Sequence, residues 1–115
     1  METMMDTHLL FSFSTPKSGG TTKLYVGTDS IAVEELGVDK FVDLFTGRND
    51  FEYSASVDVA GARKILETTG LEPGDTPTKT LGRWFVARFR GDRLATTHFV
   101  ALAKSAGVKP NIFAW

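Results

Sequence analysis

Apolar and polar residues alternate in three short stretches, and this period of two predicts three β-strands. The stretches are residues 8–14 (HLLFSFS), 22–26 (TKLYV) and 51–57 (FEYSASV). One proline and two glycines lie in residues 15–20, between the first two stretches, and such residues favour a tight turn. The sequence therefore predicts a hairpin followed by a separate half-exposed strand. The apolar face of the first strand is expected to hold Leu9, Phe11 and Phe13.

Apolar residues recur at helical spacing in residues 30–45, which predicts a helix there. Asp29 or Ser30 is placed to cap its beginning. Gly37 weakens the middle, so one kinked helix and two short helices are both compatible with the pattern.

Two further segments, residues 59–69 and 93–106, also have helical spacing. Each follows an aspartate that can act as N-cap and ends before a glycine that can terminate a helix. These capping residues are Asp58, Gly70, Asp92 and Gly107. The side chains expected to point inward are Val59, Ala62, Ile65, Leu66, Leu94, Phe99, Leu102 and Ala103.

Residues 79–90 fit two kinds of element. Their apolar residues have helical spacing, but Phe85, Ala87 and Phe89 also alternate as in a strand. We favour the helix, because Thr78 offers an N-cap.

These elements predict a single α+β domain over residues 1–115, with three or four helices packed on an antiparallel sheet of three to five strands. Residues 72–77 are its expected flexible loop. Residues 108–115 are expected to form a final edge strand or a packed terminus. With 42% hydrophobic residues, the chain can fill a core.

The chain contains no cysteine. This excludes a disulfide scaffold, a thiolate zinc site and a cysteine nucleophile, and it favours a reducing compartment. The first residues lack the basic and apolar segments of a secretion signal. No apolar run approaches the roughly 18 residues that cross a bilayer. We therefore expect a cytoplasmic protein without a membrane partner.

Charge is distributed unevenly along the chain. Residues 1–75 contain thirteen acidic and six basic residues, whereas residues 76–115 contain seven basic residues and one acidic residue. Such asymmetry indicates a charged partner for one segment, unless the two segments neutralise each other in the fold. Both interpretations stay open at this point.

Three acidic residues of the predicted helix are spaced by four, and a fourth lies beside them. We call Glu34, Glu35, Asp39 and Asp43 the acidic row. Like charges at this spacing repel each other in a helix, so a basic partner could compensate for them. A solvated helix face explains the same pattern. A catalytic carboxylate pair is disfavoured, because acids on a helix surface are hydrated.

Arginine and aromatic residues interleave in the last third of the chain. This composition is typical of phosphate binding with base stacking, and also of protein-interface hot spots. A core helix with inward aromatic rings and solvated arginines explains it equally. The basic aromatic segment comprises Arg83, Trp84, Arg88, Arg90, Arg93 and the later Lys104.

Neither histidine stands in a catalytic or metal-binding motif. His8 and His98 are ninety residues apart, and no metal-ligand spacing surrounds either. The sequence also lacks the G-x-S-x-G, S-x-x-K and G-x-G-x-x-G patterns. We therefore expect no enzyme activity, no metal and no cofactor, with His98 as a general base kept as an unsupported option.

Two stretches imitate motifs that bind phosphate or DNA. Residues 17–23 (KSGGTTK) resemble a phosphate loop, but they lie between strands, so a hairpin turn is preferred. Residues 102–113 resemble the centre of a helix-turn-helix, although the second helix would have about one turn instead of the two or more that a recognition helix needs.

Three stretches together resemble small bacterial immunity proteins: FEYSASVDVAGARKIL, LGRWFVARFRG and the closing HFVALAKSAGVKPNIFAW. Members of such families are cytoplasmic inhibitors that protect a cell from its own polymorphic or contact-dependent toxins. The resemblance covers about half to two thirds of the chain and lies in the layout of the elements. It implies a non-enzymatic protein that binds a toxin or nuclease, with the acidic row as the contact. The alternative is a small nucleic-acid-binding regulator that uses the basic aromatic segment.

Overall fold

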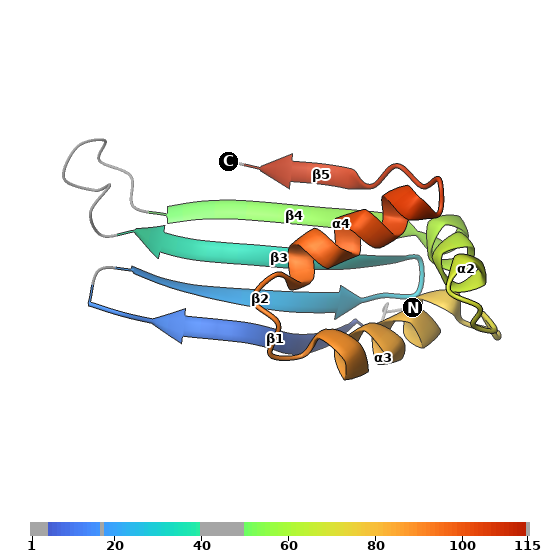
Figure 1. Ribbon diagram of the computed structural model, residues 1–115, viewed down its shortest axis with the longest axis horizontal. Helices are drawn as coiled ribbons and strands as arrows, with labels where there is room; N and C mark the ends of the chain where they lie inside the picture. Colours follow the sequence, from blue (N-terminus) through green and yellow to red (C-terminus); the bar gives the residue numbers. More distant parts are fainter. Residues whose placement is uncertain (1–4, 17, 40–49, 115) are drawn as a thin grey trace.

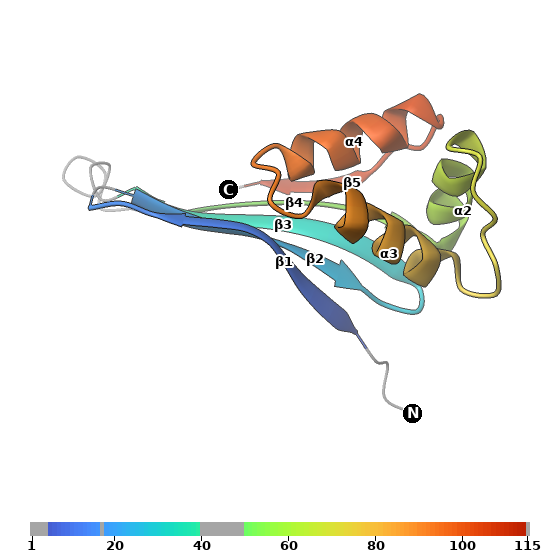
Figure 2. The ribbon, with the colours of Figure 1, turned by 60° about the horizontal axis from the view of Figure 1, so that its bottom comes forward.

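The computed structural model describes residues 5–16, 18–39 and 50–114. Within them, five strands form one antiparallel sheet in the order β1-β2-β3-β4-β5, and three helices lie on one face of it (Figure 1, Figure 2). The predicted α+β class with an antiparallel sheet is confirmed. The elements are β1 (Asp6–Ser14), β2 (Ser18–Val26), β3 (Ser30–Asp39), β4 (Asp50–Asp58), α2 (Val59–Thr68), α3 (Pro77–Phe89), α4 (Ala95–Ser105) and β5 (Asn111–Ala114).

The segment predicted as a helix from residue 30 is strand β3. Its residues Ile31 and Val33 are fully buried, at the two-residue interval of a strand. Both are β-branched and suit a pleated surface. Strands β2 and β4 on either side provide the backbone partners that a helix would find within itself. The helix prediction is therefore wrong for residues 30–39, and residues 40–49 lie outside the described residues.

The turn between β2 and β3 occupies the position of the expected helix cap. There the Gly27 N–H donates to the Ser30 carbonyl at 2.9 Å. Thr78, the expected cap of α3, lies inside that helix instead and is fully buried. Its hydroxyl donates to the Gly27 carbonyl at 2.6 Å, so this side chain fastens α3 to the turn.

A β-bulge in β1 changes which residues face the helices. Leu9 pairs with Lys23 and Phe11 pairs with Thr22, which leaves Leu10 as the extra residue. Leu10 is buried, whereas Leu9 is 50% exposed. The expectation that Leu9 shares a face with Phe11 is wrong, because the bulge shifts the alternation by one residue.

Helix α2 begins and ends as predicted. The Asp58 carboxylate accepts a hydrogen bond from the Gly61 N–H at 2.8 Å. Gly70 adopts a φ of +80°, and the Leu71 N–H donates to the Leu66 carbonyl at 2.8 Å, which closes the C-terminal cap.

The remaining elements are of the type that the sequence predicts, although some of their bounds and buried residues differ. The hairpin, strand β4 and the helical form of residues 79–89 are confirmed. Helix α4 begins at Ala95, and Leu94 before it is 55% exposed and does not point inward as expected. The last described residues form edge strand β5, which is paired with β4. The helix-turn-helix interpretation is therefore wrong, because its second helix is this strand.

The core fills the space between the helices and the sheet face that they cover (Figure 2). Among the described residues, no element covers the opposite face, which we call the open face. The sheet also extends beyond the helices at the end where β1 finishes and β2 begins. The buried core residues are Leu10, Leu24, Val26, Ile31, Val33, Ala55, Val57, Ala62, Ile65, Leu66, Leu81, Phe85, Ala95, Phe99 and Ala103.

Candidate functional site

Strand β3 separates the members of the acidic row. Side chains alternate along a strand, so Glu34 lies on the open face and Glu35 lies on the helix side with the buried Val33. Asp39 ends the strand, but its side chain and all of Asp43 lie outside the described residues. The expected stacking of carboxylates along a helix is wrong, because the period of a strand is two.

The open face carries a polar cluster around Tyr25 of β2. The Tyr25 hydroxyl donates to Glu34 Oε1 at 2.9 Å. Partial burial raises the pKa of Tyr25, and the hydrogen bond to Glu34 and the negative charges of Glu34 and Glu52 raise it further. Two carboxylates of neighbouring strands therefore act on one phenol at the centre of this face.

Three large apolar side chains of the open face are accessible to a partner. Leu9 of β1, Leu36 of β3 and Phe113 of β5 are 50%, 37% and 48% exposed. Their register partners Lys23, Glu52 and Ser54 belong to the same face. The open face therefore combines apolar contact area with hydrogen-bonding and acidic groups.

The basic aromatic segment divides into a packed part and an exposed part. The rings of Trp84 and Phe89 are half-buried against the core, 6.0 Å apart in a T-shaped arrangement. The Arg88 guanidinium lies over both rings, at 6.0 and 5.8 Å from their centroids. These rings pack as the core-helix interpretation expects. The basic side chains Arg83, Arg88, Arg90, Arg93 and Lys104 are exposed.

Charge follows the type of element more closely than the two segments of the sequence. The described strands hold seven acidic residues and one basic residue, Lys23, whereas the three helices hold six basic residues and one acidic residue. Among the described residues, the ion pair within 4.0 Å joins Asp92 to His98, and no lysine or arginine takes part in one. Direct pairing therefore does not neutralise the described acidic strands with the basic helices.

His98 of α4 contacts two neighbouring side chains, Phe89 and Asp92. Its ring stacks on Phe89 with centroids 4.9 Å apart, and Nε2 lies 3.4 Å from Asp92 Oδ2. His8 is a half-buried residue of β1. Within the described part of the chain, no three His, Asp or Glu side chains gather as a metal site.

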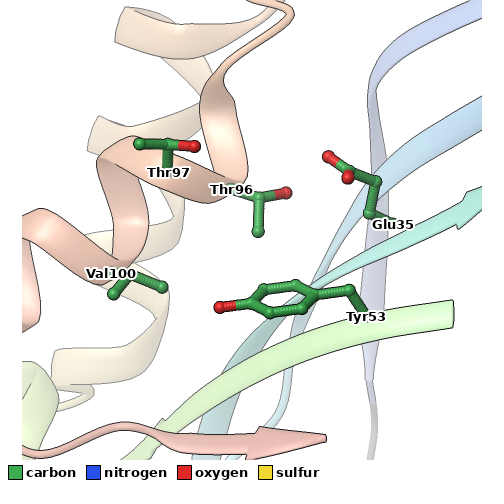
Figure 3. Close-up of a pocket in the computed structure, with 5 residues that line it drawn as sticks. All are labelled: Glu35, Tyr53, Thr96, Thr97 and Val100. Atoms are coloured by element: carbon green, nitrogen blue, oxygen red, sulfur yellow. The ribbon is translucent and has the colours of Figure 1, made fainter. Parts of the chain in front are cut away.

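A small pocket that the sequence analysis did not anticipate lies beneath α4 (Figure 3). It measures about 370 Å³ and is lined by Glu35, Tyr53, Thr96, Thr97 and Val100. Glu35 and Tyr53 are opposite each other in the β3–β4 ladder. Of these residues, only Glu35 stood among the candidates. The pocket depends on the packing of α4 over β3, and this contact joins segments some sixty residues apart.

Comparison with models of known protein families, with curated proteins and with solved structures finds no match to this chain. Among the described residues, no helix has the length and apolar character required to cross a membrane.

Proposed function

We propose that this protein acts by binding another protein through the open face of its sheet. The observation that carries the proposal is the separation of charge between acidic strands and basic helices, with no lysine or arginine in an ion pair among the described residues. The acidic groups Glu34 and Glu52 and the exposed Leu9, Leu36 and Phe113 share this face. A partner with a basic surface and apolar contacts fits this combination.

The specific form that we propose is a non-enzymatic cytoplasmic inhibitor of the immunity-protein kind, which neutralises a bacterial toxin or nuclease by direct complex formation. Nucleases need a basic surface to hold phosphates, and an acidic protein face is complementary to such a surface. The contact that we propose differs from the acidic row. It retains Glu34, adds Glu52 and excludes Glu35, which lies on the other side of the sheet.

Affinity capture with paired charge variants tests the proposal. Three chains are compared: the wild type, the double variant Glu34→Gln/Glu52→Gln and a control double variant, Glu67→Gln/Glu72→Gln. The control removes the same charge from exposed positions in and after α2. We expect the wild type and the control to retain a basic protein that the first variant releases. The purified partner should lose its toxic or nuclease activity when mixed with the wild-type chain. Equal retention by all three chains, or unchanged activity of the partner, would refute the proposal.

The exposed arginines support a second candidate, a nucleic-acid-binding regulator. Arg83 and Arg88 lie on α3, and Arg90 and Arg93 lie between α3 and α4, all exposed. Binding through phosphate contacts would weaken linearly in a plot of log affinity against log salt, and each lost contact would reduce the slope. A mobility-shift assay at low salt that detects no complex would eliminate this candidate.

A further inference from the structure

The pocket beneath α4 combines side chains from the sheet and from one helix. Glu35 of β3 and Tyr53 of β4 form its sheet side, and Thr96, Thr97 and Val100 of α4 form its helical side (Figure 3). The Glu35 carboxylate and the Thr96 hydroxyl point toward each other, and the Tyr53 ring lies below them. Oxygen atoms therefore converge above an aromatic ring.

Thr96 is the first indication of a ligand. Its side chain is 6% exposed, and its hydroxyl is buried without a hydrogen-bond partner. Buried hydroxyls nearly always have a partner, because an unpaired one loses its bonds to water without replacement. Thr96 lines the pocket and its hydroxyl points toward Glu35 (Figure 3), so a ligand group that reaches this oxygen would supply the missing partner.

Glu35 is the second indication, because its carboxylate forms no ion pair on the described part of the chain. No described lysine, arginine or histidine pairs with it within 4.0 Å.

A second hollow adjoins the pocket and shares Glu35 and Thr97 with it. It measures about 270 Å³, and its walls include Phe11, Phe13 and Leu94. The Phe11 and Phe13 rings lie 6.2 Å apart, and Phe13 is 45% exposed. This hollow offers an apolar wall beside the carboxylate.

We propose that the two hollows together bind a small organic amine. Its ammonium group would donate to the Glu35 carboxylate and the Thr96 hydroxyl, with the Tyr53 ring beneath it, and its apolar group would rest on Phe11 and Phe13. A carboxylate, hydroxyl oxygens and an aromatic ring are the groups that recognise an ammonium ion. The volume of the pocket beneath α4 is within the range of sites for small molecules. The proposed protein-binding function uses the opposite face of the sheet and shares with this site only Leu36, which also lines the second hollow.

Phenethylamine is a suitable probe, and phenethyl alcohol is its neutral counterpart. Each is titrated into ¹⁵N-labelled protein at neutral pH, and affinity is followed from the amide shifts. We expect phenethylamine to shift the Thr96 and Thr97 amides and to bind about tenfold tighter than the alcohol, since hydrogen bonds to charged groups are the stronger kind. Equal binding of the two probes, or shifts confined to other regions, would overturn the proposal.

Two variants of neighbouring residues isolate the carboxylate. Glu35→Gln is expected to weaken phenethylamine binding about tenfold, whereas Glu34→Gln, the same change on the opposite face, should alter it less than about twofold. Thr96→Val removes only the hydroxyl and should weaken binding about fivefold. Equal effects of the two glutamine variants, in spectra that show both folded, would refute the site. So would unchanged binding by Thr96→Val.

Arg93 provides a test of whether the bound ligand carries a positive charge. It lines the adjoining hollow and is exposed, so its positive charge opposes the approach of an amine. Arg93→Gln should therefore strengthen phenethylamine binding, by roughly two- to fivefold for an exposed charge. Weaker binding would mean that the arginine itself holds the ligand, which would overturn the assignment of a cation.

Discussion

The Tyr25 hydroxyl donates a hydrogen bond of 2.9 Å to the Glu34 carboxylate across the β2–β3 ladder. The bond is diagonal, because Tyr25 pairs in register with Ala32 and Glu34 pairs with Lys23. Diagonal neighbours on one face of a sheet are within reach of aromatic side chains. The bond thus fixes a phenol and a carboxylate on the face that we propose binds a partner.

Tyr25→Phe is expected to remove one source of stability that is present at neutral pH and lost at high pH. The pKa of Tyr25 is raised above 10.0 in the fold, so the folded protein holds this proton more tightly than the unfolded chain. The resulting stability is complete below the unfolded pKa and is lost as the pH rises through the folded pKa.

Urea unfolding of the wild type and Tyr25→Phe from about pH 8 to pH 11 measures this effect. The wild type should be more stable by about 0.5–1.5 kcal/mol at pH 8, because the hydrogen bond is made to a carboxylate but is only partly buried. That difference should shrink above about pH 10. Other titrating groups are common to both chains and cancel. A difference that stays constant with pH would contradict the expectation.

The fold was predictable where the local pattern and the tertiary environment agree. Residues 51–57 alternate cleanly and form β4, and Asp58 and Gly70 bound α2 as expected. The strand at residues 30–39 was not predictable, because its apolar residues do not keep a period of two: Ile31 and Val33 are buried, whereas Leu36 faces the other side. Pairing with β2 and β4 makes this segment a strand. The bulge at Leu10 was equally hidden, since it depends on the register with β2.

The candidate sites were predictable only in part, because their geometry follows from the fold. The helix prediction placed Glu34 beside Glu35, whereas the period of strand β3 puts these two side chains on opposite faces. The side chain of Asp39 and all of Asp43 lie outside the described residues. The exposure of the arginines and the packing of Trp84 could be anticipated from helical spacing. Thr96 carried no signal in the sequence, because threonine is common on helices and only the packing of α4 over β3 buries its hydroxyl.

Thr78→Val is expected to lower the free energy of unfolding by about 1–3 kcal/mol. The change keeps the shape of the side chain but removes the donor of the 2.6 Å bond to the buried Gly27 carbonyl. Thr97→Val, on the exposed side of α4, is the matched control and should change stability by less than about 0.5 kcal/mol. Urea denaturation compares the two. An equal change in the free energy of unfolding for both variants would show that the hydrogen bond from Thr78 to Gly27 does not stabilise the position of α3.

Gly82→Ala is expected to destabilise the protein, although alanine in a helix is usually favoured over glycine by about 1 kcal/mol. A Cβ at this position of α3 would lie 2.6 Å from Val26 Cγ2, closer than two carbon atoms that are not bonded to each other approach. We expect a net loss of about 1–3 kcal/mol. Val26→Ala removes the clashing methyl groups, so Gly82→Ala should cost less in that background. A stabilising Gly82→Ala in the wild type would refute this close packing.

Thr96→Val should leave the ligand-free protein as stable as the wild type, or more stable by up to about 1 kcal/mol. The hydroxyl of Thr96 is buried without a partner, so valine removes a desolvated polar atom and breaks no hydrogen bond. The direction is opposite to that expected for Thr78→Val, although both substitutions are the same chemical change at a buried helical threonine.

The comparison of Thr78 with Thr96 distinguishes a hydroxyl that stabilises the fold from one that we propose binds a ligand. Urea denaturation of the wild type and both variants, without ligand and with phenethylamine, gives six free energies. Phenethylamine should stabilise the wild type and Thr78→Val alike, and it should stabilise Thr96→Val less, because a ligand adds stability in proportion to the logarithm of its concentration over Kd. A loss of more than about 1 kcal/mol in ligand-free Thr96→Val would mean that the hydroxyl already has a partner, and the argument for a ligand would lose its first support.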